Sequence, residues 1–144
     1  FAGKGGQVHV VNFSGQTETS RVEGLSDRFE MNIVDWDGNG TGDVLFTDGN
    51  RVLVTRLDGT PLFEKKMEAK TLGFPYVYRF SAKDVRVGLT DPEQNHLLSA
   101  EKKLSKGFPI TGDSPFSIVF LGNDGFFLFA GTGNNTILKY KVQR

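Results

Sequence analysis

Three features of this 144-residue chain predict an all-β fold. Its 18 glycines and 13 phenylalanines, beside only 2 methionines, are typical of short aromatic strands joined by tight turns. Apolar and polar residues alternate along short segments, which is the pattern of strands with one buried face. The same order of strands and turns also recurs along the chain. We expect a single domain over residues 1–144, long enough to bury its own core.

In the first half of the chain we expect two strands and then a group of four. Phe29, Met31 and Ile33 share one face of their strand because they alternate with polar residues. The run 44–46 is apolar throughout, as expected of a strand buried on both faces. Asp-Gly turn signals follow the second and third strands of the group. The expected strands are 7–12 and 17–22, followed by 29–34, 44–46, 51–56 and 62–67.

The second half of the chain repeats this organisation. Each of its strands is short, rich in aromatic and β-branched residues, and bounded by glycine or polar residues. Turns are expected at 122–125 and 131–135, where glycine and asparagine cluster. The expected strands are 76–80, 85–89, 96–99 and 107–110, followed by 116–120, 126–129 and 136–140.

The repeat has a period close to 42 residues. Phe46, Val87 and Phe129 each end the second strand of a unit, at spacings of 41 and 42 residues, and the sequence of residues 1–5 resembles that of 129–133. Periods of roughly 40 to 50 residues with four strands are typical of β-propeller blades. The sequence therefore predicts a β-propeller segment of about 3 to 4 four-stranded antiparallel blades, incomplete at both ends. Its parts are a partial blade 1–24, blades 25–70 and 71–112, and a partial blade 113–144.

This number of blades is small for a closed ring, because propellers usually contain about 4 to 8 blades. The chain begins at Phe1, without a methionine or the features of a signal peptide, which favours a processed or truncated start. We expect the segment to be the C-terminal part of a longer propeller. The alternative is self-association of chains that completes a propeller ring.

Charge and composition exclude several classes of protein. The 17 basic and 17 acidic residues cancel, so no net field attracts nucleic acid, and no nucleic-acid partner is expected. No apolar run approaches the roughly 18 residues that a membrane span requires. The absence of cysteine excludes disulfides and thiol catalysis, but it leaves the cellular compartment open.

The most distinctive segment is the acidic, glycine-rich loop 35–43 (DWDGNGTGD). Its oxygen donors alternate with glycine and other residues, which is the pattern of a loop that binds a hard cation such as Ca²⁺. An EF-hand is excluded, because strands flank the loop and Phe46 stands where the bidentate glutamate would be. Without a metal, the same carboxylates would cap backbone amides of the turn. The candidate metal ligands are Asp35, Asp37, Asn39, Asp43 and the carbonyl of Thr41.

The acidic loop, the apolar strand after it, the turn at 58–59 and the run Gly107-Phe108-Pro109 together resemble the FG-GAP or VCBS type of bacterial propeller repeat. The resemblance implies that loop 35–43 joins the first and second strands of a blade and holds Ca²⁺. It also implies an extracytoplasmic location (secreted, periplasmic or cell-surface) and a protein or carbohydrate partner. The corresponding segments 81–84 and 122–125 have lost most oxygen donors, so no second metal loop is expected.

The remaining polar residues indicate no catalytic site. His9 and His96 lack metal-ligand spacing and are expected to be structural. The lysine pairs 65–66 and 102–103 are expected on outer strands or turns, where charge protects sheet edges. Trp36 is either a surface recognition residue or a cover for the hydrophobic end of the blade.

We therefore expect a non-catalytic scaffold or binding module, braced by calcium, with its binding surface on the loops. The alternative is an accessory C-terminal part of a larger propeller enzyme, of the polysaccharide lyase or quinoprotein type, whose active site lies in other sequence.

Overall fold

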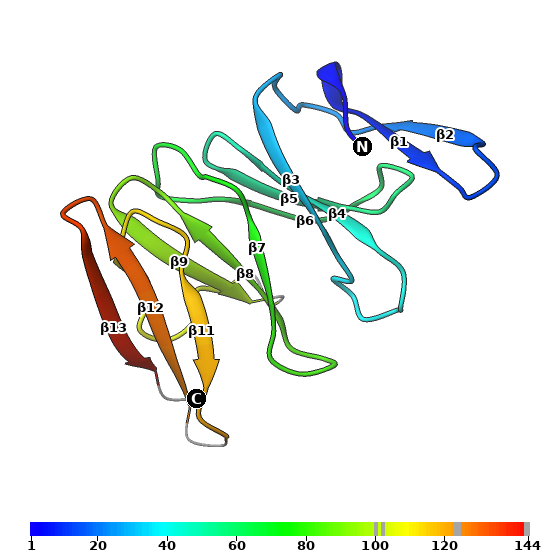
Figure 1. Cartoon of the computed structure of the whole chain (residues 1–144). Coiled ribbons are helices and arrows are strands. Elements are labelled where there is room, and N and C mark those ends of the chain that lie inside the picture. Colours follow the sequence, from blue (N-terminus) through cyan, green and yellow to red (C-terminus); the bar gives the residue numbers. More distant parts are fainter. Residues whose placement is uncertain (100, 102, 123–124, 143–144) are drawn as a thin grey trace.

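The computed structural model describes residues 1–99, 101, 103–122 and 125–142. They form thirteen strands and a 3-10 turn at Lys4–Gly6. The strands belong to four antiparallel sheets, and each sheet consists of strands that are consecutive in the sequence (Figure 1). Sheet 1 contains β1 (Gln7–Val11) and β2 (Thr17–Arg21), and sheet 2 contains β3 (Phe29–Val34), β4 (Asp43–Asp48), β5 (Arg51–Thr55) and β6 (Pro61–Lys66). Sheet 3 contains β7 (Tyr76–Arg79), β8 (Val85–Thr90), β9 (Gln94–Ser99) and β10 (Ile110–Thr111), and sheet 4 contains β11 (Ser117–Phe120), β12 (Phe126–Thr132) and β13 (Thr136–Val142).

The predicted all-β class is confirmed, and most expected strands coincide with observed ones to within a few residues. Two details were wrong. The strand expected at 107–110 is reduced to the two residues of β10, and the turn expected at 131–135 is shorter because β12 continues to Thr132. Part of the turn expected at 122–125, namely Asn123 and Asp124, lies outside the described residues. Within the described ranges no helix is long and apolar enough to cross a membrane.

The four sheets follow one another through the molecule in chain order (Figure 1). Each sheet stacks on the next through a separate cluster of buried apolar side chains. The cluster between sheets 2 and 3 is the largest and includes Leu45, Val54 and Val87. Phe46 belongs to the cluster between sheets 1 and 2, and Leu128 to the cluster between sheets 3 and 4. The core is therefore a series of layers between sheets.

Strand β4 is buried on both faces, as its uninterrupted apolar sequence predicts. Val44 and Phe46 point toward sheet 1, whereas Leu45 points toward sheet 3, because successive side chains of a strand alternate between faces. Their exposed fractions are 1%, 0% and 0%. Phe29 and Met31 of β3 also pack toward sheet 1, but Ile33, at the end of the same row, is 51% exposed.

The contact between sheets 3 and 4 depends on a glycine. The rings of Tyr78 and Phe116 are stacked with 5.1 Å between their centroids, and the Tyr78 hydroxyl donates a hydrogen bond to the Phe116 carbonyl. A Cβ atom at Gly88 would lie only 2.4 Å from the Tyr78 ring. The absence of a side chain at this position in β8 therefore leaves room for the aromatic pair.

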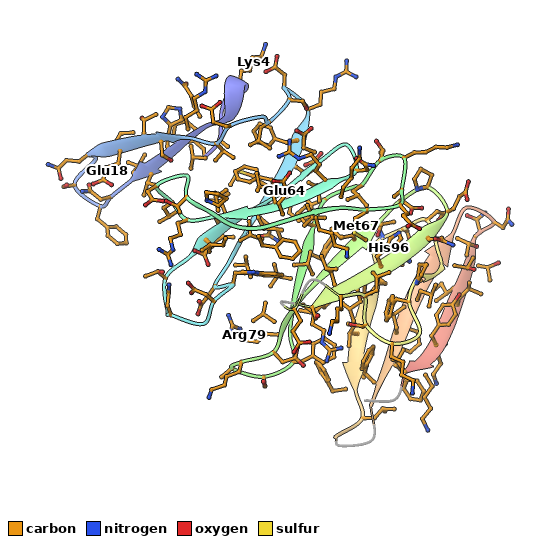
Figure 2. The ribbon with its side chains drawn as sticks, turned by 180° about the vertical axis from the view of Figure 1, so that it is seen from behind. Lys4, Glu18, Glu64, Met67, Arg79 and His96 are labelled. Carbon is orange, nitrogen blue, oxygen red and sulfur yellow. The ribbon has the colours of Figure 1, made fainter. Side chains whose placement is uncertain are left out.

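A buried polar pair closes the turn between β8 and β9. His96 lies in the interior near Met67 (Figure 2), and its Nε2 is 2.7 Å from Asp91 Oδ2. The Asp91 carboxylate also accepts hydrogen bonds of 2.8 Å from the backbone amides of Glu93 and Gln94. Burial alone raises the pKa of Asp91, but these hydrogen bonds outweigh it and hold the pKa below its ordinary value. His96 is thus a structural histidine.

The lowered pKa makes the Asp91 contribution to stability depend on pH. Ionised Asp91 stabilises the fold fully above the unfolded-state pKa of 3.8, and this stability is lost as pH falls through the lower folded-state value. We expect Asp91→Asn to reduce the free energy of unfolding at pH 7 by about 1.5–3 kcal/mol, the usual range for a hydrogen bond to a charged group. The difference from wild type should shrink in acid. Urea denaturation between neutral and acidic pH measures both effects.

The exposed Glu93→Gln variant is the matched control, because it removes a nearby acid and leaves the Asp91 hydrogen bonds in place. Parallel pH profiles for Asp91→Asn and wild type would contradict the prediction.

Candidate metal centre

The acidic loop connects the first two strands of sheet 2. Val34, at the end of β3, pairs with Asp43, at the start of β4, so the antiparallel register brings the two ends of the loop together. Gly38 and Gly40 reverse the chain between them with φ angles of 74° and 85°. A Cβ atom at either glycine would meet nothing within 4 Å, so it is the backbone conformation that requires glycine there.

Three of the five predicted ligands, Asp35, Asp37 and Asp43, form a cluster. One carboxylate oxygen from each lies within 4.8 Å of the others, and this triad could hold a metal ion. Asp43 is only 1% exposed, Asp35 is half-buried, and Asp37 is the most accessible. The triad therefore extends from the interior of sheet 2 to the surface.

Backbone amides of the loop use one oxygen of each carboxylate. Asp43 Oδ2 accepts a hydrogen bond of 3.0 Å from the Trp36 amide, and Asp35 Oδ2 accepts one of 3.2 Å from the Gly40 amide. The Asp37 Oδ1 atom likewise accepts from the Asn39 amide at 3.2 Å. Asp35 Oδ1, in contrast, is buried and has no hydrogen-bond partner among the described residues. A buried, unpaired carboxylate oxygen is costly unless a cation or donor satisfies it.

The electrostatic environment of the triad favours a cation. Burial raises the pKa of Asp43, and the negative charges of Asp37 and Asp35 raise it further, against the opposing effects of the Trp36 amide and Arg56. The only ion pair of the triad within the described ranges is peripheral, with Arg56 Nη2 3.7 Å from Asp37 Oδ2. Three carboxylates are therefore held together with little compensating positive charge.

The other two predicted ligands lie in the exposed part of the loop. Asn39 Oδ1 accepts hydrogen bonds from both the amide and the hydroxyl of Thr41, the first at 2.7 Å. This is the amide-capping geometry expected of a turn. Ligation by Asn39 and by the Thr41 carbonyl stays a prediction.

Trp36 is buried and covers one end of the sheet. Its ring contacts that of Phe63 with 5.0 Å between centroids, and it is 9% exposed. Of the two roles considered for Trp36, the structure favours the hydrophobic cover.

Sequence reasoning missed the contribution of the next sheet: Ala82, Lys83 and Val85 line a hollow of about 280 Å³ together with Asp35 and Asp37. No local sequence pattern predicts that residues 82–85 lie beside the acidic loop, because this depends on how sheets 2 and 3 stack.

Substitutions at Asp43 separate its hydrogen bond from its charge. In chelator-containing buffer we expect Asp43→Ala to lower the free energy of unfolding by about 1–3 kcal/mol, because the buried Trp36 amide loses its acceptor. Asp43→Asn keeps an acceptor and removes a like charge, so it should cost clearly less. Urea denaturation of both variants tests this, and equal losses would contradict it.

Comparisons with known proteins leave the family of the chain undetermined. No family model matches the sequence, and no curated protein shows significant similarity to it.

Proposed function

We propose that Asp35, Asp37 and Asp43 bind one Ca²⁺ and that the chain is a calcium-braced, non-catalytic β-propeller segment that recognises a protein or carbohydrate outside the cytoplasm. The observation that carries the metal assignment is the buried, unpaired Asp35 Oδ1 within a cluster of three carboxylates. A cation there would satisfy this oxygen and offset the repulsion that raises the pKa of Asp43.

The chemistry of the loop supports calcium over magnesium. Ca²⁺–oxygen distances of about 2.3–2.6 Å allow opposite ligands to lie about 5 Å apart, and the triad oxygens lie within 4.8 Å of one another. Ca²⁺ also accepts irregular sets of carboxylate, amide, carbonyl and water oxygens, whereas Mg²⁺ demands a compact octahedron. A loop that offers Asn39 and the Thr41 carbonyl in addition to the triad suits Ca²⁺.

The propeller architecture is supported by the order of the sheets. Each sheet is a meander of consecutive strands, and each stacks on the next. Val11 of sheet 1 and Ile137 of sheet 4 are 51% and 74% exposed on faces turned away from the neighbouring sheet. In a closed ring, further blades would cover these two faces.

Calorimetric titration of chelator-treated protein with CaCl₂ tests the metal site, with MgCl₂ as the competing ion. We expect one Ca²⁺ to bind per chain and to raise the melting temperature, because the ion binds the folded state preferentially. Asp35→Asn and Asp37→Asn should abolish both responses. Glu18→Gln removes an acid at the periphery of sheet 1 (Figure 2) and should retain them. Absence of heat together with an unchanged melting temperature would overturn the proposal.

A further inference from the structure

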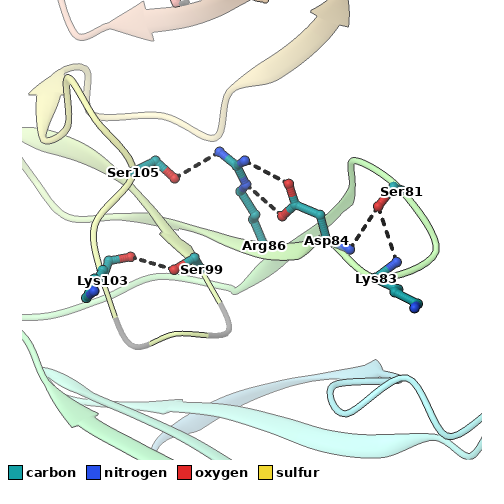
Figure 3. A network of polar contacts seen from close by, with 7 residues as sticks. All are labelled: Ser81, Lys83, Asp84, Arg86, Ser99, Lys103 and Ser105. Atoms are coloured by element: carbon teal, nitrogen blue, oxygen red, sulfur yellow. Dashed lines mark hydrogen bonds and ion pairs between the residues drawn. The ribbon is translucent and has the colours of Figure 1, made fainter. Parts of the chain in front are cut away.

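A second hollow, of about 660 Å³, lies next to the metal loop between the β7–β8 turn and the described residues that follow β9. Arg86 of β8 lines it together with Lys83, Lys103 and Lys106. The sequence predicted that Lys102 and Lys103 would protect a sheet edge. Lys103 lines this hollow, and Lys102 lies outside the described residues. Figure 3 shows Lys83 and Lys103 on either side of Arg86. Its volume falls within the range of about 300–1,000 Å³ that is usual for small-molecule sites.

The hollow is more positive than the chain as a whole, whose formal net charge is zero. Four cationic side chains line it, and the acidic ones among its described lining residues are Asp84 and Glu101. The cations outnumber the acids, and concave surfaces with an excess of one sign of charge concentrate ligands of the opposite sign. We call this surface the basic hollow.

Arg86 is held rigidly in the wall of the basic hollow. Its Nε and Nη2 donate hydrogen bonds of 2.9 and 2.8 Å to the two oxygens of Asp84, and its Nη1 donates one of 3.2 Å to Ser105 Oγ (Figure 3). The guanidinium also lies over the Phe80 ring, 4.1 Å from its centroid. A guanidinium has five N–H donors, so two remain after these bonds. A preoriented guanidinium of this kind is well suited to bind a carboxylate or sulfate.

Hydroxyl groups supplement the positive charge. Ser81 Oγ accepts hydrogen bonds from the amides of Lys83 and Asp84, and Ser105 Oγ accepts from Arg86. Because both hydroxyls act as acceptors in these bonds, their own hydrogens can be donated to ligand oxygens.

On its β9 side, the basic hollow does not offer a free strand edge to a peptide. The edge of β9 is covered by the following segment, since the Ser99 amide donates to the Lys103 carbonyl at 2.9 Å and the Ser105 amide donates to the Leu97 carbonyl at 2.8 Å. Peptide binding by strand addition requires such an edge to be open. Cations and hydroxyls are prominent among the exposed lining groups, beside Glu101 and Leu104. This favours a saccharide over an extended peptide on this side.

We propose that the basic hollow binds the oxyanion groups of an acidic oligosaccharide, either uronate carboxylates or sulfate esters. The inference rests on the proposed recognition function and names the class of ligand. Arg86 is the preoriented anchor, and Lys103 and Lys106 supply the surrounding charge.

Binding is measured by titrating the chain with three oligosaccharides of similar length: a galacturonate oligomer, a sulfated heparin fragment and a neutral cello-oligosaccharide. We expect one or both charged oligosaccharides to bind and the neutral one not to bind. Raising the salt from about 20 to 200 mM should weaken binding through screening. The stronger of the two charged ligands identifies the carboxylate or the sulfate as the preferred group.

The double variant Lys103→Gln/Lys106→Gln should lower the affinity about tenfold or more, with an unchanged melting temperature because both side chains are exposed. The matched control is Lys4→Gln/Lys141→Gln, which removes the same charge from exposed positions outside the hollow and should bind as wild type. Arg86→Lys keeps the charge but loses the two guanidinium N–H donors that the bonds to Asp84 and Ser105 leave over, and it should also weaken binding.

Three results would overturn the proposal: no binding of either charged oligosaccharide, equal losses in the two double variants, or tighter binding of a glutamate-rich peptide than of both saccharides. Calcium binding is measured without saccharide, and saccharide titrations run with calcium and with chelator. Failure of the basic hollow is therefore distinguishable from failure of the metal site.

Discussion

Burial of the central strands on both faces is the constraint on which the rest of the structure depends. In β4, alternate side chains enter two different clusters, so sheet 2 is attached to sheet 1 on one face and to sheet 3 on the other. The loop between β3 and β4 inherits this rigidity. It begins after Val34, which is 3% exposed, and ends at Asp43, which is 1% exposed. The carboxylates are thus held together because hydrophobic packing of β3 and β4 fixes both ends of the loop.

The all-β class and most strands were predictable because their signals are local, whereas the blade arrangement stays a prediction. The apolar run 44–46 marked a strand with no solvent face, and Asp-Gly turns marked strand ends. The short length of β10 could not be predicted from such local signals. Gly107 has a φ of 88°, and within residues 107–111 only Ile110 and Thr111 pair with β9. The length of that strand depends on where β9 offers a partner, which the segment itself does not encode.

The candidate metal site was predictable only in part, because some of its features depend on contacts between segments that are distant in the sequence. Alternating acids and glycines indicated that Asp35, Asp37 and Asp43 would converge, and they do. The unpaired oxygen of Asp35 and the burial of Trp36 depend on side-chain packing within and between sheets. Lys83 lies in the turn between β7 and β8 of sheet 3, and its place beside the acidic loop follows from the stacking of sheets 2 and 3. Local periodicity carries no information on such contacts.

Lys83 and Val85 line both the hollow beside the acidic triad and the basic hollow, so the two surfaces adjoin. A cation held by the triad would add positive charge next to the proposed anion site and favour anion binding there. By thermodynamic reciprocity, the anion would raise the affinity for the cation by the same factor. If both proposed sites are occupied, the affinity of the basic hollow for an acidic glycan would rise where calcium is plentiful and fall where calcium is scarce.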